Sequence, residues 1–549
     1  MKRILTLAML MLAAISTAQA AEKYPQRWNY VGASLNNDAG LTKFIDVLKQ
    51  SKEVGCTHIL MPEGGWYNTP DNPAYLARVA KAKAAAKELN LTLIPCVYSL
   101  GYSGRYLGAD PNLAAGLPVK QVPFVVAGKT AQVDPSLAID CSAVKPNEDG
   151  NIDVELKARP YTHYSIRFTL TKGQYKGDAD EMLRISTCKK SDGWKRWVTR
   201  THPISYKEGN KFIAQTTFNT LELDDGVMRL QIMAPCADIK IEPIGAMNMV
   251  RRELTPLVVT SEDGKTVYAE GKDYKPFHDP NLMTAPDWTD QPTPGAAPKL
   301  LGPAMELTDN SSIKNGQKLL LSYFHAYRIY GDQDEISMED PKVFDLMERD
   351  AANCVKVWGA PGYFMNYDEI RICGWEPTPS GKPMTPGEIL AEHVKKGYDL
   401  LKKHAPQATI YTWSDMFSPF ENAYGPGQGK RYYYLVHDYW NGADKGLPTD
   451  TTIMIWAAQN SDDIKFFADR GQQQVLCGYY DTKTDAGMKQ NITRWLQFSS
   501  GQKGILGFMY TTWGHDYARL KPYFKLLDTA DTWYKPTGSA QQKAEGMPQ

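Results

Sequence analysis

The sequence lacks several signatures that would assign a protein to a functional class directly. Its 62 Lys and Arg residues are balanced by 62 Asp and Glu residues, so no net charge favours nucleic acid as a partner. None of the eight cysteines forms a CxxC pair, which argues against a zinc or redox site. No G-x-G-x-x-G, P-loop or His-Glu-x-x-His motif occurs, so we expect no cofactor and no metal ion.

Long apolar runs are also scarce. The one near the start, in "MKRILTLAMLMLAAISTAQA", follows two basic residues and ends in Ala-Gln-Ala. This pattern is typical of a secretory signal peptide over residues 1–20, with cleavage before Ala21. No later segment reaches about 18 consecutive apolar residues, the length that a membrane helix needs. We therefore expect a secreted or periplasmic protein without membrane insertion.

Aromatic residues are abundant instead, with 13 Trp and 31 Tyr. Aromatic side chains build hydrophobic cores, which accounts for part of this content. Exported proteins also use them to bind sugars, because aromatic faces pack on the C–H faces of sugar rings. Composition alone leaves both explanations open.

Helical and strand-like patterns alternate in two separate parts of the chain, residues 21–117 and 304–549, which predicts a parallel sheet. Residues 118–250 carry short alternating strands divided by turn signals, which predicts a β-sandwich of jelly-roll type. Residues 251–303 read as a hairpin and a Pro-rich connector. The sequence therefore predicts a (β/α)8 barrel with a β-sandwich inserted after its third strand. The sequence offers nine candidate strands for eight barrel positions, so one of them does not belong to the barrel. We expect this to be "KLLLSYFHAYRIYG", just after the insertion.

Functional residues of such barrels lie at the C-terminal ends of the strands. Nearly every candidate strand here ends in an aromatic residue beside a carboxylate, imidazole or amide. Carboxylates can act as acid, base or nucleophile in glycosidic cleavage, and aromatic rings can form a sugar platform. We expect the following residues to contact the substrate: Glu63, His325, Arg371, Trp413, Asp415, Trp456, Tyr479, Asp481 and Trp513.

The stretch "GYFMNYDEIRICGWE" places two adjacent carboxylates at the end of an aromatic strand. A carboxyl group enclosed by aromatic residues resists ionisation and can serve as a general acid. We assign Glu369 as the catalytic acid/base and Asp368 as the carboxylate that orients a reacting group. The alternative is an ordinary surface turn in which Arg371 forms an exposed ion pair.

The order of these residues resembles glycoside hydrolase family 20, the β-N-acetylhexosaminidases. The family's Asp-Glu pair matches Asp368-Glu369, and its Trp-Asp-like segment resembles Trp413-Ser414-Asp415. Its Tyr-x-Asp segment matches Tyr479-Tyr480-Asp481, and its late tryptophan matches Trp513. The resemblance implies a retaining exo-enzyme that uses the substrate's own 2-acetamido oxygen as nucleophile. In that mechanism Asp368 would hold the acetamido nitrogen, Tyr479 its oxygen, and Asp481 and Trp513 the sugar. Arg27 is a looser match to the family's arginine at the first strand, and the resemblance implies that it contacts the substrate as well.

Other interpretations remain open at this stage. Glu369 could act with Asp415 or Asp481 on a neutral sugar, or the protein could bind glycans without cleaving them. The inserted sandwich could bind carbohydrate or only cap the barrel. Glu63 fits a turn and His325 a hydrogen-bonded core position as well as a binding site. A disulfide between Cys141 and Cys236 is conceivable in an exported protein.

Overall fold

The computed structural model describes residues 24–32, 34–68, 70–171, 182–187, 190–201, 204–283, 300–329 and 333–534. The predicted signal peptide, Cys188 and most of the Pro-rich stretch lie outside these ranges. Among the described helices, none has the length and apolar character needed to cross a membrane.

Eight parallel strands close into a barrel, in the order β1-β2-β3-β19-β21-β23-β24-β25. All eight lie in the two parts of the chain where helical and strand-like patterns alternate, residues 21–117 and 304–549, so the predicted barrel is confirmed. Large apolar side chains such as Trp28, Phe364 and Met454 fill its interior, which is therefore a packed core. The barrel strands are β1 (Gln26–Tyr30), β2 (His58–Met61), β3 (Thr92–Val97), β19 (Gly362–Met365), β21 (Thr409–Trp413), β23 (Thr452–Ile455), β24 (Gln474–Tyr479) and β25 (Ile505–Thr511).

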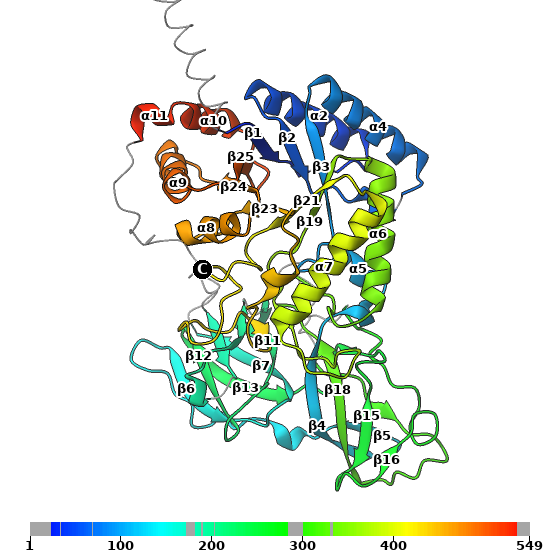
Figure 1. The fold of residues 1–549 in the computed structure, drawn as a ribbon. Coiled ribbons are helices and arrows are strands. Elements are labelled where there is room, and N and C mark those ends of the chain that lie inside the picture. The colour runs from blue at the N-terminus through cyan, green and yellow to red at the C-terminus, as the bar shows by residue number, and fades with distance from the viewer. Residues whose placement is uncertain are drawn as a thin grey trace, which may run out of the picture.

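Helices follow most barrel strands and cover the outside of the barrel (Figure 1). Their starts are set by local sequence: Asn37 and Asn72 cap α2 and α4, and Thr385 forms a capping box with Glu388 on α7. The helices are α2 (Asp38–Glu53), α3 (Gly65–Asn68), α4 (Pro73–Glu88), α5 (Gly104–Leu107), α6 (Lys342–Trp358), α7 (Pro386–His404), α8 (Ser461–Asp469), α9 (Asp485–Phe498), α10 (Leu520–Asp528) and α11 (Ala530–Trp533).

The insertion between β3 and β19 contains two four-stranded antiparallel sheets with the strand orders β10-β11-β7-β13 and β6-β12-β8-β9. Inward-facing side chains of both sheets share one apolar core, so the predicted sandwich is present. Cys141 and Cys236 are both free thiols, and the conceivable disulfide between them is absent. The strands are β6 (Ile152–Lys157), β7 (His163–Leu170), β8 (Leu183–Ser186), β9 (Trp197–Thr201), β10 (Ile204–Glu208), β11 (Lys211–Asn219), β12 (Val227–Ile232) and β13 (Cys236–Pro243).

A third sheet of the insertion was not predicted as a separate unit. It holds the ninth candidate strand, β18, which pairs antiparallel with β4 over most of its length and does not enter the barrel. Every second residue of β18 is buried, as an antiparallel strand with one solvated face requires. This sheet and its neighbours comprise β4 (Gly116–Ala127), β5 (Thr130–Val133), β14 (Met249–Val250), β15 (Val258–Ser261), β16 (Val267–Tyr268), β17 (Met305–Glu306) and β18 (Lys318–Ala326).

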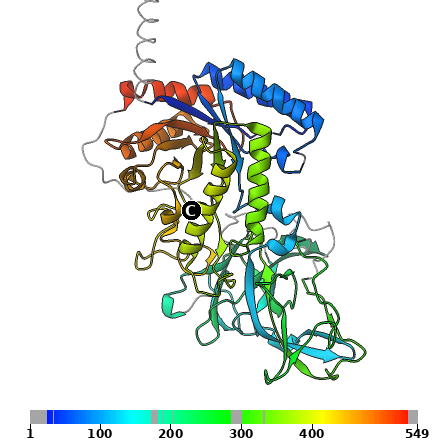
Figure 2. The same cartoon turned by 45° about the vertical axis from the view of Figure 1, so that its right-hand side comes forward.

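The inserted sheets lie together beyond one end of the barrel, the end at which the barrel strands finish (Figures 1 and 2). A small parallel sheet of β20 (Ile372–Cys373) and β22 (Leu435–Val436) lies in the loops at the same end.

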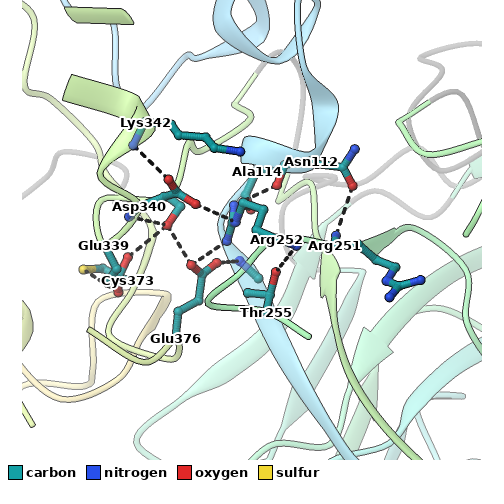
Figure 3. A network of polar contacts seen from close by, with 12 residues as sticks. Asn112, Ala114, Arg251, Arg252, Thr255, Glu339, Asp340, Lys342, Cys373 and Glu376 are labelled. Atoms are coloured by element: carbon teal, nitrogen blue, oxygen red, sulfur yellow. Dashed lines mark hydrogen bonds and ion pairs between the residues drawn. The ribbon is translucent and has the colours of Figure 1, made fainter. Parts of the chain in front are cut away.

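Insertion and barrel loops are joined by buried charges (Figure 3). Arg252, after β14, lies 2.5 Å from a carboxylate oxygen of Glu376 and 3.2 Å from one of Asp340, all of them buried. Its Nη1 also donates to the carbonyl oxygen of Ala114 at 2.9 Å. Breaking such a buried network is costly, so it fixes the insertion against the loops that form the barrel's C-terminal face.

Candidate active site

An open cavity of about 1330 Å³ occupies the C-terminal mouth of the barrel and extends along α2. Five of the predicted site residues line it: Asp368, Glu369, Trp413, Trp456 and Trp513. Tyr30, Ser99, Tyr102, Asn366, Tyr480 and His515 also line it and were not among the predicted site residues. The strand ends that the sequence singled out therefore converge on one cavity, as expected for this barrel type.

Three carboxyl groups lie together at the barrel mouth: Asp368 and Glu369 line the cavity, and Asp415 is fully buried beside them. Asp415 accepts a hydrogen bond from the backbone N–H of Glu369, with 3.2 Å between its Oδ2 and the nitrogen. Its other oxygen accepts from the indole Nε1 of Trp456 at 3.2 Å. Asp368 lies beside this pair, is only 9% exposed, and its Oδ1 has no hydrogen-bond partner among the described residues.

Burial and mutual repulsion shift two of these carboxyl groups toward the protonated form. Burial raises the pKa of Asp368 well above its ordinary value, and the neighbouring Asp415 and Glu369 raise it further. Burial likewise raises the pKa of Asp415 to about 7, against the hydrogen bond from Glu369 that lowers it. The cluster can therefore hold protons at neutral pH, as a site for acid catalysis requires.

Glu369 is held differently from its two neighbours. Its Oε1 lies 3.0 Å from Nη2 of Arg371, and its Oε2 accepts hydrogen bonds from the hydroxyl of Tyr102 and from Nε2 of Gln333. The Gln333 amide also lies 2.6 Å from the Tyr102 hydroxyl, so these donors support one another. Arg371 is buried, at 2% exposure of its side chain, which rules out the alternative of a surface turn.

Tyr102 and Gln333 come from the two ends of the inserted region, just after β3 and shortly before α6. Tyr102 lies near the end of the predicted strand "LTLIPCVYSLGYS", so the rule for strand ends already points to it. Gln333 carries no signal in the sequence, because its contact with Glu369 depends on how the chain returns from the insertion.

Three tryptophans that line the cavity form an aromatic box beside the carboxyl groups. The ring centroids of Trp413 lie 6.4 Å from those of Trp456 and 5.8 Å from those of Trp513, and Trp456 and Trp513 are 6.0 Å apart. The planes of each pair cross at 62–79°, so the rings contact one another edge to face and form one aromatic wall of the cavity. Tyr480 lies parallel to Trp456 at 6.0 Å and extends the wall.

The backbone after β24 explains which tyrosine reaches the cavity. Tyr479, Tyr480 and Asp481 have φ of 71°, 52° and 55°, a left-handed run that non-glycine residues rarely adopt. It directs Tyr480 to the cavity and leaves Tyr479 buried against Tyr510, at a centroid distance of 4.0 Å. The expectation that Tyr479 contacts substrate is therefore wrong by one position. Glu369 has the same kind of φ, 49°.

Asp481 supports the aromatic box from outside the cavity lining. Its Oδ2 accepts from the backbone N–H of Trp513 at 2.8 Å and of Gly514 at 3.1 Å. Its Oδ1 accepts from the hydroxyl of Thr512 at 2.6 Å. Both oxygens are thus committed to positioning the loop that carries Trp513.

Two other predicted binding residues, Arg27 and His325, lie away from the cavity at the barrel mouth. Arg27 pairs with Asp528 and donates to the carbonyl oxygen of Val54, near the start of β1, so it lies toward the other end of the barrel. His325 is fully buried in the insertion, stacked on His163 at 3.8 Å. The expectations for Arg27 and His325 are wrong, because a strand position and a motif order do not fix which end or which sheet a residue joins.

Glu63 is buried and bound by its own neighbours. It accepts from the hydroxyl of Tyr75 at 2.7 Å and from the backbone N–H of Gly65 at 3.0 Å. It borders a smaller pocket beside the main cavity. Across the described residues, no cluster of three or more His, Cys, Asp or Glu side chains could hold a metal ion.

No protein-family model and no curated protein sequence matches this chain. Similar solved structures are glycoside hydrolases at low identity. A rhamnosidase from Novosphingobium sp. PP1Y shares 11% identity over 94% of this chain and 60% of its own length, less than two thirds, with a TM-score of 0.37. The GH20 catalytic modules of the pneumococcal exo-β-D-N-acetylglucosaminidase StrH share 8% identity, over 92% of this chain and 84% of their own length, with a TM-score of 0.32. A GH20 exo-β-N-acetylglucosaminidase from Vibrio harveyi shares 12% identity, over 38% of this chain and 34% of its own length, with a TM-score of 0.25. Values of this size assign no family to the chain.

Proposed function

We propose that this protein is an exported glycoside hydrolase that binds the end of a glycan at the barrel mouth and cleaves its glycosidic bond. The observation that carries the proposal is that Asp368 and Glu369 line the same cavity as the three tryptophans, with Asp415 hydrogen-bonded to Trp456 and to the backbone of Glu369. Glycosidic cleavage needs carboxyl groups in two protonation states and a surface that holds a sugar ring. Both requirements are met by side chains of this one cavity.

The substrate class that we favour is a glycan ending in a β-linked N-acetylhexosamine. The tryptophans that line the cavity offer aromatic surface to a small apolar group such as the acetamido methyl. The unpartnered Oδ1 of Asp368 can accept a hydrogen bond from the acetamido N–H. The acetamido oxygen would then attack the anomeric carbon while Glu369 protonates the leaving oxygen and later activates water. Tyr480, which lines the cavity, takes the place proposed for Tyr479.

A second division of roles is favoured by the partners of Glu369. Its ion pair with Arg371 suits a carboxylate that acts as nucleophile or base. Asp415, with a pKa raised to about 7, suits the proton donor. In that case the enzyme needs no acetamido group, and its substrate can be a neutral sugar.

Hydrolysis of a panel of 4-nitrophenyl glycosides separates these possibilities. The panel pairs β-N-acetylglucosaminide and β-N-acetylgalactosaminide with β-glucoside and β-galactoside, which differ in the 2-substituent, and adds a fucoside. The assisted mechanism predicts turnover of the acetamido sugars only, and inhibition by a thiazoline analogue of the bicyclic intermediate. Equal turnover of the neutral sugars would support the pair of Glu369 and Asp415. Glycan binding without turnover of any glycoside or oligosaccharide would contradict the proposed activity.

A further inference from the structure

A side pocket of about 330 Å³ opens next to the carboxyl cluster. Pro62, Ser99, Tyr102 and Asn366 line both this pocket and the main cavity, so the two spaces share a wall. Tyr102 is the residue whose hydroxyl donates to Glu369. The volume is at the lower end of the range for ligand pockets, about 300–1,000 Å³, which suits roughly one sugar ring.

Arg105 lines this pocket and is held in place without a carboxylate. Its guanidinium lies over the ring of Tyr67, 4.8 Å from the centroid. It also lies against the backbone of Gly64, where a Cβ atom would fall only 1.4 Å from Nη1. A glycine at position 64 is therefore required for the guanidinium to occupy this position, which gives a reason for the Gly-Gly sequence after Glu63.

Arg105 is exposed, and the carboxylates around it are bound by other groups. Asp350, whose pKa is lowered by the charge of Arg105, forms its ion pair with Arg349. The carboxylate of Asp334 is bound by Nε and Nη2 of Arg328, at 2.7 and 3.0 Å. The carboxylate of Glu63 is bound by Tyr75 and by the backbone of Gly65. Arg105 forms no hydrogen bond or ion pair with any residue that the structure describes. Its planar set of donors, which matches a carboxylate or sulfate group, is therefore available to a ligand.

We propose that the side pocket is a sugar subsite that selects an anionic substituent, bound by Arg105, on the sugar next to the reacting one. The substituent is a carboxylate, as in a hexuronic acid, or a sulfate ester. This inference rests on the proposed glycosidase function for its place in a reaction, and it narrows the substrate class to acidic glycans.

The test is binding of matched disaccharides to the full chain, measured by isothermal titration in the Glu369→Gln background so that no substrate is consumed. One arm compares a glucuronic acid residue with glucose, and the other a sulfated with an unsulfated N-acetylhexosamine. We expect the anionic member of at least one pair to bind about tenfold more tightly, as one charge-assisted contact allows. The arm that responds identifies the anion.

Two substitutions then assign the preference to this pocket. Arg105→Gln removes the charge, and Gly64→Ala displaces the guanidinium while leaving Arg105 in the sequence. We expect each to reduce the ratio of anionic to neutral affinity to about one, whereas Arg105→Lys retains part of it. Arg229→Gln, which removes an exposed arginine paired with Asp153 on the sandwich, is the matched control and should retain the full ratio.

Equal affinities in both pairs, or a preference that survives both Arg105→Gln and Gly64→Ala, would overturn the proposal. Far-ultraviolet circular dichroism of each variant shows whether a loss reflects unfolding. Because the readout is binding, it is independent of turnover. If the protein hydrolyses aryl glycosides but binds the anionic and neutral disaccharides equally, only the proposed subsite is contradicted. If it binds anionic disaccharides through Arg105 but hydrolyses no glycoside, only the proposed activity is contradicted.

Discussion

The guanidinium of Arg371 lies 3.0 Å from the carboxylate of Glu369, two residues earlier in the chain, and both belong to the loop after β19. The backbone N–H of Arg371 also donates to Oε1 of Glu335, at 3.2 Å. Its charge lowers the pKa of Asp368 and Glu335, although burial raises both more strongly. One buried cation thus offsets several carboxyl groups, and the stability of the site depends on it.

Replacing Arg371 by methionine should destabilise the protein by about 3–5 kcal/mol, because it leaves buried carboxylates without a countercharge. Urea unfolding at pH 7 measures this loss. Arg371→Lys keeps the charge and should recover part of it. A methionine variant as stable as the wild type would show that the ion pair does not hold the loop.

Asp415 predicts a specific pH dependence of stability. Its folded-state pKa of about 7 lies above the ordinary value near 3.9, so the folded protein keeps a proton that the unfolded chain releases. Stability contributed by this group is therefore full below pH 4 and is lost as the pH rises to about 7, at about 1.4 kcal/mol per pH unit. The stability of Asp415→Asn relative to that of the wild type should therefore increase from pH 4 to about pH 7 and stay constant above pH 7. Parallel stability curves for the two proteins would contradict the raised pKa.

The sequence predicts those parts of the structure that depend on local periodicity. All eight barrel strands, the place of the insertion and the convergence of Glu369, Trp413 and Trp513 follow from alternation and from the rule for strand ends. The sandwich follows from its short strands and turns. These features are encoded in neighbouring residues, so they can be read without knowledge of tertiary contacts.

Features that depend on long-range contacts or on unusual backbone could not be predicted. Gln333 reaches Glu369 only through the return path of the insertion. The choice of Tyr480 over Tyr479 depends on three consecutive positive φ angles, which the sequence does not reveal. His325 has the surroundings of a strand end in sequence, yet β18 pairs with β4 and buries it in another sheet.

Tyr102 should tune the reaction through its hydrogen bond to Glu369. Tyr102→Phe removes one donor to the carboxylate and keeps the ring, so we expect kcat to fall about tenfold, the scale of one charge-assisted hydrogen bond. KM should change less, because the ring still lines the cavity. Steady-state kinetics on the best aryl glycoside measure both constants. Unchanged kcat would mean that the Tyr102 contact has no role in the reaction.

Asp481 should act through the position of Trp513. Asp481→Ala frees the backbone N–H groups of Trp513 and Gly514 and should loosen the aromatic box. We expect binding to weaken, with KM rising about tenfold, the order of one lost aromatic contact. The KM of the Trp513→Phe protein, compared with that of the double variant, shows whether the two changes act through the same group. If Asp481→Ala weakens binding equally when Trp513 is already replaced, the positioning role is wrong.

The most direct test of the account is the effect of Glu369→Gln on hydrolysis of the best aryl glycoside, beside Glu306→Gln, an exposed glutamate of the insertion that pairs with Lys275. The substitution keeps the size of the side chain and removes its ability to exchange a proton or carry charge. We expect kcat/KM to fall by about 10²–10⁴ in Glu369→Gln, the scale of acid–base catalysis, and to stay at the wild-type value in Glu306→Gln. Wild-type activity in a correctly folded Glu369→Gln protein would show that the carboxyl cluster at the barrel mouth does not carry the chemistry.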